Sequence, residues 1–282
     1  MLGDMVSLLW APFLMCLVLT GLHAYLGVHV LAREVVFVDI ALAQITALGA
    51  TGAFLVGYEA DTRVSYFFGL AAASLGALVL SLTRSRGRHV SQEAVIGAVY
   101  AVSTAAAVLL ADRAPHGAEH VRSMLIGNIL TVRVPQVIEV GAIYLGIGLL
   151  HWVYRREFLL ISTDPDAAFA QGWRVRLWDF VFYASFGVVV TTSVRIAGVL
   201  LVFSYLIVPA LAGSLLGGTL ATRLLVGWGL GALVSVIGMV ASASLDLPTG
   251  ATVVCVFGVT LVALWAVARV VARRALIHSR ES

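Results

Sequence analysis

The sequence contains no lysine, so all 18 of its basic side chains are arginine. Charged residues of either sign make up only 12% of the 282 residues, whereas a soluble domain has about a quarter. Hydrophobic residues make up 61%, and the mean hydropathy is +1.01. Backbone in a lipid bilayer must satisfy its own hydrogen bonds, which helices do. The composition therefore predicts an all-α, polytopic helical membrane protein that forms a single transmembrane domain over residues 1–282.

The missing motifs exclude several kinds of enzyme. A Walker A phosphate loop needs a lysine, and the chain has none. The apolar blocks contain no His-Glu-x-x-His, no Gly-x-Ser-x-Gly and no paired aspartates. We therefore predict that the chain is not an enzyme and carries no cofactor. Any ATP and magnesium used in its work must then be bound by another chain.

Cysteine and histidine are sparse inside the apolar blocks. Cys16 and Cys255 are the two cysteines, and we expect both to be buried free thiols. His23, His29 and His151 are each isolated in the sequence. We expect all three to pack between helices rather than to bind a metal.

Nine apolar blocks are long enough to cross a membrane as helices, and eight crossings result if one block is re-entrant. Of the 18 arginines, alternating spans place 13 on one side of the membrane and five on the other. The positive-inside rule makes the arginine-rich side cytoplasmic, with the N-terminus outside and the C-terminus inside. The net charge of +3 carries no indication of a nucleic-acid partner, because these arginines lie beside the membrane. The predicted spans are 6–30, 35–57, 64–83, 92–111, 135–153, 177–194, 197–217, 223–243 and 249–268.

The longest polar interval, 154–176, separates two of these spans on the predicted cytoplasmic side. A hydroxyl side chain can cap a short helix there, two carboxylates favour its first turn, and Gly172 can end it. Such a helix suits the docking of another protein, and an ordinary cytoplasmic loop is the alternative. The residues at its start are Ser162, Thr163, Asp164 and Asp166.

The second span carries two polar residues, Asp39 and Gln44, near its cytoplasmic half. An ionisable group within a span is costly and commonly faces the bundle interior or a wet cavity. Hydration at the interface beside Arg33 is the alternative for Asp39. Similarly, Asp179 lies within a turn of Arg174–Arg176, and an interfacial ion pair is its expected role.

The loop 112–133 clusters His116, Glu119 and His120 on the predicted outer side. A weak metal-attracting mouth is one interpretation, and a solvated polar loop is the favoured one. Ser91 and Glu93 fit a capped start of the fourth span.

Two proline positions predict irregular backbone. Pro209 lies inside the seventh span, where it removes a backbone hydrogen bond, so we expect a kink or break with a gating role. Asp246 and Pro248 predict an outer turn before the last span.

Four motifs, in order along the chain, resemble a known family over residues 8–268. Asp164–Gly172 (DPDAAFAQG) resembles its Asp-x-Glu-x-Ala-x-x-x-Gly segment, and Arg195–Gly213 resembles its Gly-x-Leu-Leu to Pro-Ala span. Asp246–Ala251 (DLPTGA) resembles its Asp-x-Pro-x-Gly turn, and Ser123–Leu130 resembles its Leu-x-Gly-x-Leu block. The family is the permease subunit of zinc, manganese and iron ABC importers, whose fold is similar to that of cobalamin and siderophore permeases.

The resemblance implies a translocation pathway for a divalent transition metal in a bacterial plasma membrane. It implies a second copy of the chain, a cytoplasmic ABC ATPase and an extracytoplasmic solute-binding protein as partners, besides membrane lipid. It also implies that Asp164–Gly172 is a coupling helix seated on the ATPase, with Asp164, Asp166, Ala168 and Gly172 at the contact.

The second span departs from the family pattern, Gly-Asp-x-x-x-His. Aligning Leu42–Gly49 with it places Gln44 at the histidine position and Ile40 at the aspartate position. Asp39 precedes Gln44 by five residues, so the two are about 140° apart on a regular helix. We retain Asp39 and Gln44 as candidate metal ligands. An organic or chelated substrate is the alternative within the same architecture, and an intramembrane enzyme or a passive channel are alternatives of other classes.

Overall fold

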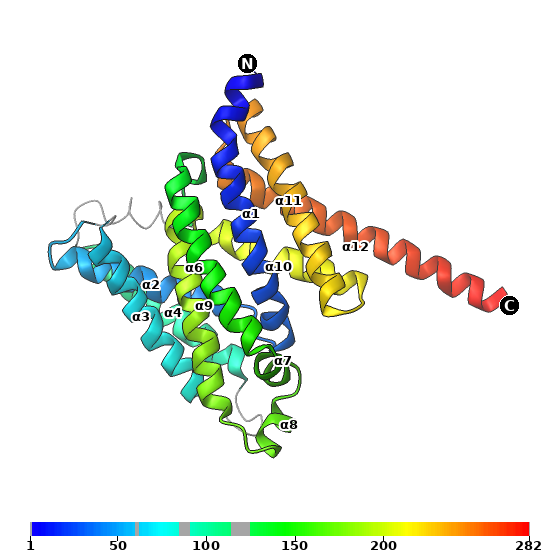
Figure 1. Ribbon diagram of the computed structural model, residues 1–282, viewed down its shortest axis with the longest axis horizontal. Coiled ribbons are helices and arrows are strands. Elements are labelled where there is room, and N and C mark those ends of the chain that lie inside the picture. The colour runs from blue at the N-terminus through cyan, green and yellow to red at the C-terminus, as the bar shows by residue number, and fades with distance from the viewer. Residues whose placement is uncertain (1, 60–61, 85–90, 114–124, 282) are drawn as a thin grey trace.

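The computed structural model describes residues 2–59, 62–84, 91–113 and 125–281 (Figure 1). Within these residues all regular structure is helical, and nine helices are long and apolar enough to span a membrane. Each span lies within three residues of its predicted limits, which confirms the fold class. The helices are α1 (Leu2–Ala32), α2 (Val38–Leu55), α3 (Arg63–Leu82), α4 (Gln92–Ala111), η1 (Ile129–Thr131), α6 (Val134–Val153), α7 (Arg155–Thr163), α8 (Pro165–Ala170), α9 (Val175–Ala197), α10 (Val199–Leu216), α11 (Leu220–Leu245) and α12 (Thr249–Glu281).

The spans form two groups that pack most extensively within themselves. The first group is α2, α3, α4 and α9, and the second is α1, α10, α11 and α12. Helix α6 contacts one helix of each group, α1 and α9. Figure 1 shows α2, α3 and α4 on one side of α9, with α11 and α12 beyond α1 on the other side. The last part of α12 extends away from the bundle.

Small residues allow close helix contacts in both groups. A Cβ atom added to Gly49 would lie 2.6 Å from the Phe68 carbonyl oxygen of α3. In the second group, a Cβ atom at Gly231 would lie 2.5 Å from Thr20, and one at Gly227 would lie 3.2 Å from the Pro209 carbonyl oxygen. Both glycines of this Gly-x-x-x-Gly motif therefore face a neighbouring helix, as close packing in membranes requires.

The predicted burial of the cysteines and histidines holds for Cys16 and the histidines but not for Cys255. Cys16 is fully buried, as expected. The expectation for Cys255 is wrong, because this residue is exposed on the outer surface of α12. An apolar block does not distinguish a face that contacts other helices from one that faces lipid. The three histidines, His23, His29 and His151, are buried between helices, as predicted.

The two proline predictions have different outcomes. Helix α10 continues through Pro209 from Val199 to Leu216, so the helix does not break there, and the kink stays a prediction. A span can retain its other hydrogen bonds around a proline, especially where neighbouring helices pack against it. The predicted turn is confirmed: α11 ends at Leu245, Asp246 is left-handed with φ 52°, and α12 begins at Thr249.

A compact backbone junction lies at the opposite end of the bundle from α8. The amide of Asn128 donates to the Ile196 carbonyl oxygen at 3.1 Å. Gly127 and Gly198 meet here with φ values of 64° and 78°, and a Cβ atom on Gly198 would lie 2.5 Å from the Gly127 amide nitrogen. A Cβ atom on Gly250 would lie 2.7 Å from the Ile126 carbonyl oxygen. Three segments far apart in the sequence thus pack backbone against backbone.

Candidate coupling and translocation sites

Helices α7 and α8 form a short angled segment between α6 and α9, at one end of the molecule (Figure 1). Phe158 and Ile161 of α7 are fully buried, and Ala168 of α8 packs with Ile161 and Val175. Asp164 and Asp166 are exposed. One face of the segment is therefore anchored to the bundle while its carboxylates face outward.

The cap of α8 differs from the prediction. The Asp164 carboxylate accepts a hydrogen bond from the Ala167 amide at 2.9 Å, so Asp164 is the N-cap, not Ser162 or Thr163. Pro165 is the physical reason, because proline favours the first helical position and its predecessor then becomes the cap. Ser162 and Thr163 instead end α7, where their hydroxyls donate to carbonyl oxygens one turn earlier.

The end of α8 agrees with the prediction. Gly172 has φ 76°, a left-handed conformation that favours glycine. Its amide donates to the Phe169 carbonyl oxygen, and the Trp173 amide donates to that of Ala168. This turn redirects the chain from α8 into α9.

A buried charged cluster lies beneath this segment. Arg33 donates from Nη1 to Asp179 Oδ1 at 2.6 Å, and both side chains are fully buried. Arg84 pairs with the same carboxylate, with Nε 3.2 Å from Oδ2, and its side chain is 13% exposed. The predicted pairing of Asp179 with Arg174–Arg176 is therefore wrong. Asp179 lies on the face of α9 that turns toward the bundle, where Arg33 follows α1 and Arg84 follows α3.

Ser162 extends this cluster to α7. Its Oγ lies 2.8 Å from Arg33 Nε, 2.9 Å from His29 Nδ1 and 2.7 Å from the Phe158 carbonyl oxygen. One arrangement of protons satisfies all three contacts: the hydroxyl donates to Phe158, while Arg33 and the Nδ1–H of His29 donate to the hydroxyl oxygen. Spacing in the sequence gives no signal for this contact, since Arg33 and Ser162 are separated by 129 positions.

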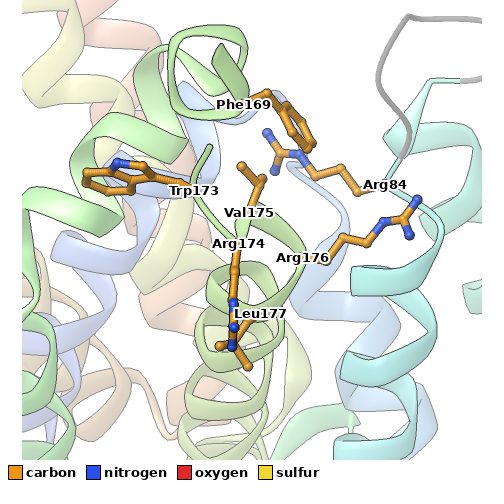
Figure 2. A pocket seen from close by; sticks show the side chains of 7 residues that line it. All are labelled: Arg84, Phe169, Trp173, Arg174, Val175, Arg176 and Leu177. Atoms are coloured by element: carbon orange, nitrogen blue, oxygen red, sulfur yellow. The ribbon is translucent and has the colours of Figure 1, made fainter. Parts of the chain in front are cut away.

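A basic groove of about 560 Å³ opens next to α8. Figure 2 shows Arg84 extending toward Phe169 from the end of α3, with Arg176 beside them and Trp173 directed away. Arg174 lines the groove as well, and the residues that line it include no carboxylate. Three guanidinium groups and the Phe169 ring form a surface suited to an acidic partner.

Asp39 is a buried carboxylate in the second span, α2. It is 1% exposed, and neither carboxylate oxygen has a hydrogen-bond partner among the residues that the structure describes. Gln44 is half-buried on the same helix, and α2 is α-helical without interruption from Val38 to Leu55. Because no bulge separates the two residues, the helix keeps them on different faces.

The described residues contain no group of three or more histidine, cysteine, aspartate or glutamate side chains arranged to hold a metal ion. The predicted mouth formed by His116, Glu119 and His120 lies outside the described residues. The predicted cap of the fourth span is confirmed, because Ser91 Oγ accepts from the Ala94 amide at 3.2 Å. Glu93 accepts from the Phe37 amide and so contacts the start of α2.

Comparison with known proteins gives one family. The family model described as "ABC 3 transport family" matches residues 5–268. The manganese import system permease protein ScaB of Streptococcus parasanguinis is 24% identical over 81% of this chain and 79% of that protein. The manganese transport system membrane protein MntC of Listeria innocua is 25% identical over 82% of this chain and 80% of that protein. A chain of the solved structure "PsaBC from Streptococcus pneumoniae in complex with Fab" superposes with a TM-score of 0.76, at 19% identity, over 94% of this chain and 95% of that chain.

Proposed function

This chain belongs to the ABC 3 transport family, and from that membership we propose that it is the permease subunit of an importer for a divalent transition metal. Manganese is the first candidate, with zinc and iron as the other members of the class. The observation that carries the proposal is the family match over residues 5–268, together with relatives of similar length that are named for manganese import. The protein is a multi-pass component of a bacterial plasma membrane.

The translocation pathway in this proposal passes Asp39. A fully buried carboxylate without a partner is costly, and a passing cation would supply the missing charge. Gln44 offers only a neutral amide oxygen, which is a weaker ligand than the imidazole that the family pattern places there. A second copy of the chain completes the pathway, because one bundle packs its own core tightly around α2.

Coupling to ATP hydrolysis takes place at α7 and α8 in this proposal. The sequence has no lysine for a Walker A phosphate loop, so in this proposal ATP and magnesium are bound by a separate ABC ATPase. The exposed carboxylates Asp164 and Asp166 and the turn at Gly172 present α8 to that ATPase, and Ala168 anchors it from below. The groove containing Arg174 and Arg176 receives acidic side chains of the same partner.

The other end of the bundle faces an extracytoplasmic solute-binding protein in this proposal. The Asp246–Pro248 turn lies at that end, beside the start of α12.

Pro209 lies within α10, at the contact between α10 and α11, where it leaves a carbonyl of its own helix without the usual donor. Opening of the pathway at this contact is the gating role that we assign to it.

The test is reconstitution of the chain with its ATPase and binding protein in lipid vesicles. We expect ATP-dependent accumulation of radioactive manganese that excess zinc or iron reduces to different extents. An ATPase variant that binds but does not hydrolyse ATP is the control. Accumulation of a metal chelate, with no uptake of the free ion, would replace this function by the alternative of a chelated substrate.

A further inference from the structure

We propose that Arg33 is a positioning residue for energy coupling. Its side chain connects the α7–α8 segment to helices of both packing groups. This inference rests on the proposed function, since it assigns a role within the coupling of ATP hydrolysis to transport. Arg33 directly follows α1 of the second group, Asp179 belongs to α9 of the first group, and Ser162 belongs to α7. The guanidinium therefore contacts both groups and the segment that faces the ATPase.

The geometry uses separate parts of the guanidinium for separate elements. Nε donates to Ser162 and Nη1 donates to Asp179, while Cζ lies over the Phe182 ring, 3.9 Å from its centroid. A lysine ammonium offers a single point charge and cannot reproduce both hydrogen bonds together with the contact to the Phe182 ring. Because the Arg33 side chain is completely buried, water cannot replace either bond. A displacement of α7 must therefore break the Ser162 contact or move Arg33 with it.

Arg84 supplies the link from this buried contact to the protein surface. It pairs with Asp179 at 3.2 Å and also lines the groove beside Phe169 of α8 (Figure 2). An acidic side chain entering the groove competes with Asp179 for Arg84. Asp179 keeps Arg33 as a partner in either state, so the buried pair remains intact while its outer partner changes. Docking at the groove thereby removes the Arg84 charge from the Asp179 carboxylate that Arg33 contacts, while the Arg33–Asp179 pair stays intact.

The test compares two serine-to-alanine variants that make the same chemical change. Ser162→Ala removes the contact between Arg33 and α7. Ser185→Ala removes a similar buried contact, in which the Ser185 hydroxyl lies 2.9 Å from His151 Nε2, but it breaks no hydrogen bond to α7 or Arg33. The His151 ring stacks on Phe158 of α7 and is unchanged in both variants, so the comparison isolates the Ser162–Arg33 hydrogen bond. Each variant is assembled with the ATPase and binding protein in vesicles, and metal transported per ATP hydrolysed is measured. Thermal unfolding of both variants shows whether the fold is equally preserved.

We expect Ser162→Ala to lower the metal transported per ATP by about tenfold, the scale of one lost hydrogen bond to a charged group. The ATPase should still bind, and Ser185→Ala should keep the wild-type ratio. A purely structural role would lower the amount of folded protein without changing the ratio. Arg33→Lys is the second variant, and it should lower the ratio to a similar extent while the charge near Asp179 is retained.

Equal ratios in the Ser162 and Ser185 variants would overturn the inference and leave the proposed function standing. Wild-type ratios in Arg33→Lys would overturn it in the same way. Failure of the wild-type chain to bind an ATPase or to transport metal would instead overturn the proposed function, and this inference with it.

Discussion

Two aspartates are buried to the same extent in this protein but have opposite surroundings. Asp179 is 0% exposed and contacts two arginines, whereas Asp39 is 1% exposed and both of its oxygens lack a partner among the described residues. A buried carboxylate is costly unless it is paired or bound to a metal. Asp179 meets this requirement within the chain. Asp39 does not meet it among the described residues, and in the proposed function a passing cation supplies the missing partner.

The local helices partly explain how Asp39 is tolerated. Asp39 lies in the first turn of α2, where the positive end of the helix dipole favours a carboxylate. Asp179 lies more than one turn inside α9, where this contribution is weaker. Asp179 is thus paired within the chain, whereas Asp39 is the unpaired carboxylate that the proposed function assigns to the cation.

Substitution of Asp39 should have the largest effect on transport. Asp39→Asn removes the charge that a divalent cation requires, so we expect metal uptake to be abolished while the protein remains folded. Uptake of radioactive manganese into vesicles, at equal amounts of inserted protein, measures this. Uptake that survives unchanged would show that Asp39 does not contact the cargo and would favour a chelated substrate.

An aspartate-to-asparagine substitution at Asp179 should lower the stability of the protein. Asp179→Asn leaves the Arg33 guanidinium buried without a charge partner, so the free energy of unfolding should fall by about 3–5 kcal/mol. Thermal unfolding in mild detergent gives the difference from wild type. Asp39→Asn is the matched control and should leave stability unchanged or increase it. Similar losses in the two variants would remove the distinction between the sites.

The exposed aspartates of α8 extend the comparison to carboxylates that face outward. We expect the combined change of Asp164, Asp166 and Gly172 to alanine to uncouple ATP hydrolysis from transport while membrane insertion is preserved. Each carboxylate at a helix N-terminus contributes only about 0.3–1 kcal/mol, so the fold should tolerate their loss. The ratio of metal transported to ATP hydrolysed is the measurement. An unaltered ratio would contradict the assignment of α8 to coupling.

The smallest effect is expected at Gln44. Gln44→His introduces a stronger metal ligand, but a position about 140° from Asp39 on a regular helix prevents convergence of the two side chains. We therefore expect no measurable change in manganese or zinc affinity, as determined by calorimetry on the purified complex. A clear gain in affinity would show that α2 departs from its regular form when metal binds.

The sequence was sufficient for features that depend on composition or on neighbouring residues. Long apolar blocks determine the spans, and Gly172 and Asp246–Pro248 determine turns through local backbone preferences. The cap at Asp164 was missed because Pro165 outweighs the hydroxyl residues that precede it. The exposure of Cys255 was missed because lipid and protein are both apolar neighbours.

The charged cluster could not be predicted from spacing at all. Arg33 and Asp179 are 146 positions apart, and each lies near the end of its span, where an interfacial role was the simplest expectation. Their pairing depends on how α1 and α9 are placed in the bundle. The candidate metal site was only partly predictable for a similar reason: the burial of Asp39 follows from packing, while the angle to Gln44 follows from helix geometry.

The junction of Gly127, Gly198 and Gly250 has a consequence for the order of folding. Its backbone contact joins residues about seventy positions apart, and such non-local contacts form slowly because the intervening chain must first be closed into a loop. The segment before η1 can dock only after the junction between α9 and α10 at Gly198 is in place. A larger residue at Gly198 should therefore trap chains whose spans are already inserted but whose last helices are not yet assembled.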